Sequence, residues 1–221
     1  MLLAQKDNRN DASEQRMINF LIHFYRKGSR PFRSLSALPE AEAVSTMKSL
    51  YVEGAVFWER FKDPYEYLCI RREVEKHLWS KFKEKGGCPQ NDYPIYLVLG
   101  RPKWTMMVAD AATLATTEEI QVPLSVLKEE EVSFTYPDSM VSALMVRQKD
   151  PGYYEPEYHG KVFTLKEMQQ IIRKKGLPGE GWETHMPGHL AHYIEAQVWN
   201  QSTLNDYLTG FTTRSGSREG Q

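Results

Sequence analysis

The chain has little cysteine and no long hydrophobic run, and both absences restrict what it is. Its 221 residues include only Cys69 and Cys88, too few for a disulfide framework and typical of a protein from a reducing compartment. No apolar stretch reaches the roughly 20 residues that a membrane-spanning helix needs. The start, Met-Leu-Leu-Ala-Gln-Lys-Asp, turns polar too early for a signal peptide. We therefore expect a cytoplasmic protein that does not enter a membrane.

Excess charge and the common catalytic loops are also missing. The formal net charge is −1, so composition predicts no general affinity for nucleic acid. The pair Gly86-Gly87 follows a predicted helix, whereas a phosphate-binding loop must open one. No Gly-x-Ser-x-Gly nucleophile elbow occurs either. These absences remove the most easily recognised nucleotide-binding and hydrolase classes.

The first part of the chain, residues 1–90, has helical patterns. Apolar residues at helical spacing predict a helix over residues 17–28, and a second follows Pro39 and runs toward Gly54. The clearest helix begins at Asp63-Pro64, with Asp63 as the cap and proline at the first helical position. On its flank we expect Arg71 and Glu75 to form a solvated ion pair.

The second part, residues 91–211, is richer in strands. Thr164 and Glu167 form a capping box that predicts one helix among these strands, and residues 212–221 lack apolar anchors and are expected to be disordered. The sequence thus predicts a single α+β domain over residues 1–211, with N-terminal helices packed on a mostly antiparallel sheet. The expected strands are Tyr93–Gly100, Trp104–Val108, Ile120–Val122, Val132–Tyr136, Ser139–Val146, Lys161–Phe163 and Tyr193–Trp199.

The last of these strands, Tyr193–Trp199, has the most distinctive pattern. Its residues alternate, so that Ile194, Ala196 and Val198 point one way while Glu195 and Gln197 point the other, between two aromatic rings. This period is typical of a half-buried strand. Its polar face, with a carboxylate beside an amide, is a candidate floor for a functional site.

Three short patterns resemble the ADP-ribosyltransferases of the Arg–Ser–Glu type. Arg101 follows an early strand, Ser133 and Thr135 share a face of a middle strand, and Glu195 and Gln197 share a face of the last strand. The resemblance spans about the last 130 residues. The middle strand reads Ser-Phe-Thr where the family has a Ser-Thr-Ser-like motif, and the glutamate precedes the glutamine, reversing the usual order.

The resemblance implies NAD as the cofactor and a protein or nucleic-acid target. By position, Arg101 would hold the pyrophosphate, because bidentate arginine suits phosphate. Ser133 and Thr135 would shape the nicotinamide pocket, with Tyr136 or Trp199 stacked on the ring. The catalytic pair would be Glu195 and Gln197, with Glu195 steadying the ribose and the oxocarbenium-like transition state.

A different class of function stays open. Twelve tyrosines and five tryptophans suit a non-catalytic adaptor that docks a macromolecular partner through exposed aromatic rings, and the loop Tyr153–Tyr158 is the best candidate surface. A basic aromatic patch of Arg30, Phe32 and Arg33 together with Arg71 and Arg72 would suit a nucleic-acid strand. The simpler interpretation is a connector between helices that carries surface charges.

Histidines form the remaining cluster. His185, His189 and His192 are a possible zinc ligand set, but Pro187 and Gly188 interrupt the helix that would align the first two. We therefore expect loop histidines and no metal.

Overall fold

The computed structural model describes residues 18–55, 58–102, 105, 113, 116–178 and 190–216, with only the backbone described for 211–216. A six-stranded sheet runs through it in the order β3-β1-β2-β6-β4-β5, and every strand pair is antiparallel. The strands are β1 (Phe20–Arg26), β2 (Ile95–Leu99), β3 (Thr117–Pro123), β4 (Val132–Thr135), β5 (Phe163–Thr164) and β6 (Glu195–Val198). The α+β class predicted from the sequence is confirmed.

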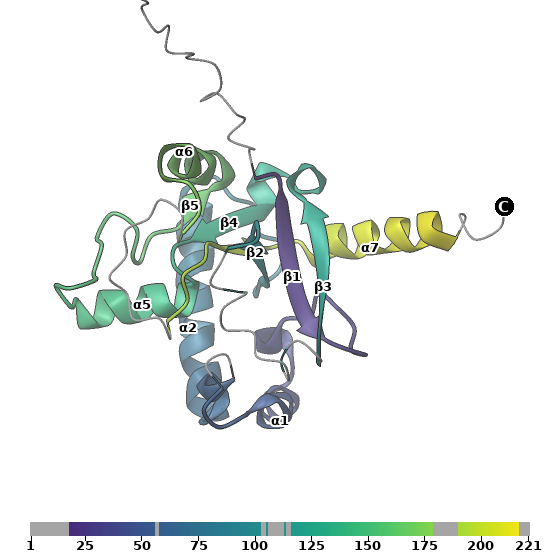
Figure 1. Cartoon of the computed structure of the whole chain (residues 1–221), viewed down its shortest axis with the longest axis horizontal. Coiled ribbons are helices and arrows are strands. Elements are labelled where there is room, and N and C mark those ends of the chain that lie inside the picture. The colour runs from purple at the N-terminus through teal and green to yellow at the C-terminus, as the bar shows by residue number, and fades with distance from the viewer. Residues whose placement is uncertain are drawn as a thin grey trace, which may run out of the picture.

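Helices lie on both faces of this sheet (Figure 1). The helices are α1 (Glu40–Leu50), α2 (Pro64–Glu84), α5 (Ser139–Gln148), α6 (Leu165–Lys175) and α7 (Gln201–Gly216), with short 3-10 turns η1 (Leu35–Ala37), η2 (Glu59–Phe61), η3 (Leu124–Val126) and η4 (Glu129–Glu131). No helix in the described ranges is both long and apolar enough to cross a bilayer.

The two faces differ in chemistry. On one face, side chains from α6 and α7, including Met168 and Leu204, pack with strand residues such as Ala196 and Val198 in the main apolar cluster. The other face lies under α2 and α5. There Phe82 of α2 packs with Trp199, while polar side chains occupy the strand centres. Figure 1 shows α2 running along the sheet and α7 projecting from the β3 side.

The predicted helix starts follow the expected chemistry. Asp63 caps α2 by accepting a hydrogen bond from the backbone N–H of Glu66 at 3.0 Å, and proline occupies the first turn. Thr164 and Glu167 form the predicted capping box of α6. Helix α1 packs on α2 through Ala43, Met47 and Leu68. Local capping signals in the sequence therefore marked the starts of α2 and α6.

Two element assignments were wrong. Residues 17–28, predicted as a helix, contain β1, because a segment that is apolar on both sides also fits a strand buried on both faces, as Leu21 and Ile22 are. Residues 139–146, predicted as a strand, begin α5, whose N-terminus Asp138 caps by accepting from Val141 N–H at 2.8 Å. The part over 1–90 is therefore not purely helical, and in the described ranges two helices, α5 and α6, lie among the later strands where one was predicted.

Two further predictions fall partly or wholly outside the described residues. Helix α7 continues to Gly216, inside the tail 212–221 that was expected to lack structure, and residues 217–221 lie outside the described ranges. The expected strand Trp104–Val108 also lies outside them, apart from Thr105.

Candidate functional site

Strand β6 separates the two faces as its alternation predicts. Ile194, Ala196 and Val198 belong to the main apolar cluster, while Glu195 and Gln197 point to the face under α2 and α5. The strand is buried on both faces, however, and not half-buried, because helices cover each side: Glu195 is 9% exposed and Gln197 is fully buried. The polar face is thus an interior layer.

Strand register brings the predicted polar residues together. Antiparallel pairing sets Thr135 opposite Glu195 and Ser133 opposite Gln197, so all four side chains share one face of neighbouring strands. On the other side of β6, Tyr96 of β2 stands opposite Gln197. The sequence analysis did not identify Tyr96 as a site residue. The alternation of side chains along β2 does place it on the same face as Gln197.

A chain of hydrogen bonds joins these side chains. Trp199 Nε1 donates to Ser133 Oγ at 2.9 Å, and Ser133 Oγ donates to Gln197 Oε1 at 3.0 Å. Gln197 Nε2 then donates to Thr135 Oγ1 at 2.9 Å and to Glu195 Oε2 at 3.2 Å. Gln197 uses its carbonyl and amide ends at once, which fixes the orientation of the amide. We call these five residues the β4–β6 network.

The network ends at a pair of carboxylates beside the N-terminus of α5. Glu195 Oε2 accepts from the Ser139 N–H at 2.9 Å. Asp138 Oδ2 accepts from the Tyr193 hydroxyl at 3.3 Å, while Oδ1 caps the helix. Burial raises the pKa of Glu195 to about 7, and the nearby Asp138 adds to this rise. Burial raises the pKa of Asp138 as well. A carboxyl that titrates near neutral pH suits acid–base or electrostatic catalysis.

Helix α2 adds a buried ion pair that the sequence had suggested to be solvated. Arg71 Nε donates to Glu75 Oε1 at 3.0 Å, and the side chains are 12% and 0% exposed. Arg71 also lies over the Tyr96 ring, 4.4 Å from its centroid, and bonds the Tyr67 hydroxyl at 3.3 Å. Burial raises the pKa of Tyr96 well above its ordinary value, and Glu75 adds to this rise. The signal for burial was available, because Arg71 and Glu75 continue the stripe of Tyr67, Leu78 and Phe82.

Two predicted cofactor residues lie apart from the network. Arg101 pairs with Glu119 of β3 through two hydrogen bonds, one of 3.0 Å, and the two side chains are 42% and 43% exposed. Tyr136 belongs to the main apolar cluster on the opposite face and packs edge-on against Tyr158, with ring centroids 5.9 Å apart. Trp199, the other predicted stacking ring, is inside the network but has no exposed surface.

Neither aromatic surface predicted from the sequence is fully exposed in the structure. In the Tyr153–Tyr158 loop, Tyr158 is buried and Tyr153 and Tyr154 are only half-exposed, so no open aromatic patch forms there. Phe32 is also buried, with its backbone N–H donating to His23 Nε2 at 3.0 Å, so the predicted basic aromatic patch loses its ring.

The structure does not test the predicted histidine cluster as a whole. His185 and His189 lie outside the described residues, and within those ranges no three potential ligands gather around a metal position.

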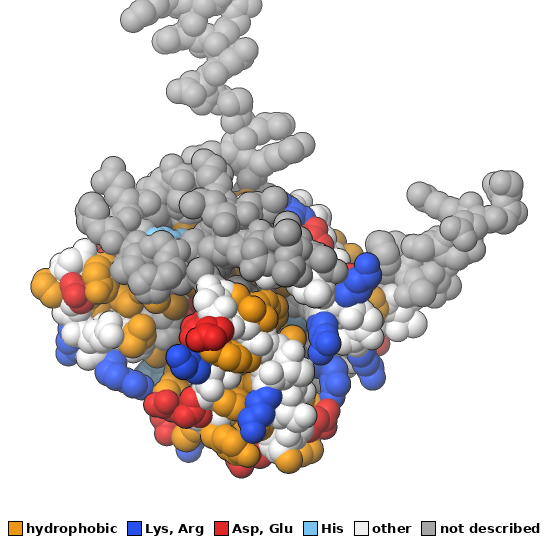
Figure 2. Space-filling model, turned by 60° about the horizontal axis from the view of Figure 1, so that its bottom comes forward, with side chains coloured by type: hydrophobic (Ala, Val, Ile, Leu, Met, Phe, Trp, Pro, Cys, Tyr) orange, Lys and Arg blue, Asp and Glu red, His pale blue; other side chains and the backbone are white. Residues whose placement is uncertain are grey.

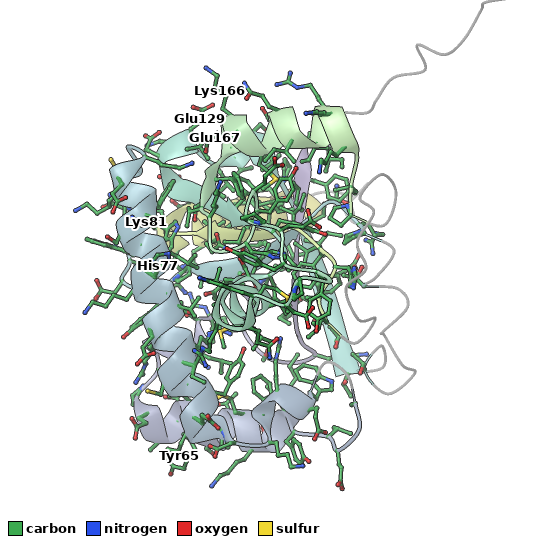
Figure 3. All side chains as sticks on the ribbon, turned by 90° about the vertical axis from the view of Figure 1, so that its left-hand side faces the viewer. Tyr65, His77, Lys81, Glu129, Lys166 and Glu167 are labelled. Carbon is green, nitrogen blue, oxygen red and sulfur yellow. The ribbon has the colours of Figure 1, made fainter. Side chains whose placement is uncertain are left out.

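An open groove runs along the outer side of α2. It has a volume of about 570 Å³ and is lined by Glu40, Tyr65, Leu68, Cys69, Arg72, Glu73, Lys76, Trp79, Asp92 and Tyr93. Tyr65 is 57% exposed, and Figure 3 shows it pointing away from the body at the lower end of α2. On the coloured part of the face in Figure 2, hydrophobic side chains are interspersed with charged ones. Glu195 does not line this groove.

Comparison with known proteins gives no relative from which a function could be taken. No family model matches the chain, and neither a curated protein nor a solved structure is significantly similar to it.

Proposed function

We propose that the chain is an NAD-dependent ADP-ribosyltransferase in which Glu195 is the catalytic carboxylate, acting on a protein or nucleic-acid target. The observation that carries this proposal is the register of β4 and β6. It sets Thr135 against Glu195 and Ser133 against Gln197, on one face and in one hydrogen-bonded network. A Ser/Thr-bearing strand beside a strand that carries a fixed glutamate is the arrangement that the resemblance implies.

The ends of the strands support the same assignment. Because β6 is antiparallel to β2 and to β4, the start of β6 at Glu195 lies beside the ends of β2 and β4. Arg101 follows β2 by two residues, and Asp138 follows β4 by three. A pyrophosphate would replace Glu119 as the partner of Arg101. Breaking the pair would lose little free energy, because an exposed ion pair contributes about 0–1 kcal/mol.

The chemistry assigned to this chain is electrostatic. In ADP-ribosyl transfer the bond from the ribose C1′ to nicotinamide breaks, and positive charge develops at C1′. A carboxylate already fixed by Ser139 N–H and Gln197 Nε2 stabilises that charge without reorganising during the reaction. Ser133 and Thr135 position the glutamine that holds the carboxylate in place.

We expect Glu195→Gln to lower NAD consumption by about 100-fold or more, since removing one preorganised electrostatic group has effects of this size. Wild-type activity should rise as the pH passes about 7, because the ionised carboxylate is the active form. Nicotinamide release, measured by chromatography from pH 5 to 9, tests both expectations.

Glu131→Gln is the matched control for that experiment. Glu131 is also buried, at 5% exposure, and accepts from Asn200 Nδ2 at 2.8 Å, but it precedes β4 at the opposite end of the strands. An equal loss of activity in both variants would attribute the effect to stability and not to chemistry.

A second candidate function is an adaptor that docks a partner in the groove on α2. It is favoured by the exposure of Tyr65 at the end of that groove. We expect Tyr65→Asp to remove partners that co-purify with the wild type, while Tyr153→Asp, in the loop first suggested by the sequence, retains them. Quantitative mass spectrometry of the three purified proteins makes the comparison, and identical partner profiles would exclude the groove.

A further inference from the structure

The groove on the outer side of α2 is long enough to take a second helix. Tyr65 and Trp79 both line it, and their separation along α2 corresponds to about 21 Å at 1.5 Å per residue. Tyr65 is 57% exposed and Trp79 is half-buried, so an aromatic ring is accessible near each end. Figure 3 shows α2 at an outer boundary of the molecule, with Tyr65, His77 and Lys81 pointing away from it. The helix is therefore accessible along its length.

Two opposite charges lie between these rings. Glu73 and Lys76 line the groove and are exposed. Among the residues that the structure describes, neither side chain forms an ion pair, with the other or with a third residue. The neighbouring Arg72 is engaged elsewhere, because its guanidinium donates to the backbone oxygens of Ser36 and Leu38. The groove thus presents one carboxylate and one ammonium to an incoming partner.

These four residues are arranged almost symmetrically along the helix. The midpoint of Tyr65 and Trp79 is residue 72, and the midpoint of Glu73 and Lys76 lies less than one turn away. A second α2 that runs antiparallel to the first, about a two-fold axis near these midpoints, brings each Tyr65 to the partner's Trp79. It also brings each Glu73 to the partner's Lys76. An interface with two-fold symmetry requires such self-complementarity, because the same surface serves both subunits.

We propose that α2 of a second copy of this chain occupies the groove, in an antiparallel homodimer. Tyr65 packs on the partner's Trp79, Glu73 pairs with the partner's Lys76, and each contact occurs twice. The rings supply apolar contact area, while the ion pairs fix the register and the orientation. The dimer does not depend on NAD chemistry; it rests on the second candidate function and names the occupant of that groove. Because one helix from each copy forms the contact, we expect a weak dimer, as small interfaces usually give.

Charge reversal at the two central positions tests this pairing. Glu73→Lys turns both ion pairs into pairs of like positive charge, and Lys76→Glu turns them into pairs of like negative charge. We expect each variant alone to associate about 100-fold more weakly than the wild type, because juxtaposed like charges oppose binding. An equal mixture of the two variants restores opposite charges at both contacts, so we expect a heterodimer of nearly wild-type affinity. Sedimentation equilibrium of the full chain over a range of concentrations measures all four samples.

Glu129→Lys is the matched control, since Glu129 is also exposed but lies far from Tyr65 in Figure 3. We expect it to dimerise like the wild type. A wild type that stays monomeric at every concentration overturns the dimer; foreign partners that it loses on Tyr65→Asp would then assign the groove to another protein and leave the adaptor function in place. A dimer that survives both single reversals, or a mixture of the two variants that does not associate, also overturns this interface.

Discussion

Replacing Arg71 by methionine is expected to destabilise the protein by about 3–5 kcal/mol, the usual cost of removing one partner from a buried ion pair. The substitution leaves the Glu75 carboxylate at 0% exposure without its cation. The second oxygen, Glu75 Oε2, is already buried and has no hydrogen-bond partner among the described residues, so no spare donor compensates. Urea unfolding monitored by tryptophan fluorescence measures the loss.

The double variant Arg71→Met/Glu75→Leu should recover most of that stability. Without the two charges, folding no longer carries the free-energy cost of removing them from water. Apolar replacements for a buried ion pair are therefore often neutral or stabilising. Arg33→Met is the surface control: its partner is Glu42, both side chains are about half exposed, and we expect a loss of no more than about 1 kcal/mol. A double variant as unstable as Arg71→Met alone would show that Arg71 acts mainly through packing on Tyr96.

The sequence predicted the helices whose caps were identified, α2 and α6, but it missed the equally local cap of Asp138 on α5 and misassigned the buried segment of β1. Asp63 and Thr164 mark α2 and α6 because capping depends on residues three positions apart. The segment around Leu21 and Ile22 carries no such mark, and its strand exists because β2 and β3 pair with it from more than 70 residues away. A single sequence contains no direct sign of that pairing.

The same distinction applies to the site. Alternation along β6 correctly assigned Glu195 and Gln197 to one face, and register then joined them to Ser133 and Thr135. Alternation could not reveal that α2 and α5 cover that face, and so the polar layer was expected to be open. The placement of Arg101 beside Glu119 depends equally on the unforeseen neighbour β3.

Gln197→Glu is expected to destabilise the protein by several kcal/mol at pH 8, because it buries another carboxylate directly beside Glu195. Gln197 Nε2 now donates to Glu195 Oε2 at 3.2 Å. A carboxylate in its place replaces that donor by a like charge, in a position with no exposed surface. Ser133 Oγ can still donate a hydrogen bond to one oxygen of the new carboxylate. The loss of stability therefore comes mainly from the other oxygen, which faces Glu195.

The pH dependence of this variant identifies charge as the cause. Burial beside Glu195 raises the pKa of the new carboxyl in the folded state above about 4.3, its ordinary value in an unfolded chain. Its destabilising effect is therefore absent below that pH and grows by about 1.4 kcal/mol per pH unit until the pH reaches the folded pKa. In acid the protonated carboxyl again offers a donor to Glu195. Urea unfolding at pH 4 and pH 8 should thus differ strongly for Gln197→Glu and little for Gln121→Glu, an exposed control on β3. An equal loss at both pH values would mean that Gln197 matters for its shape, and that the charge of Glu195 does not govern this layer.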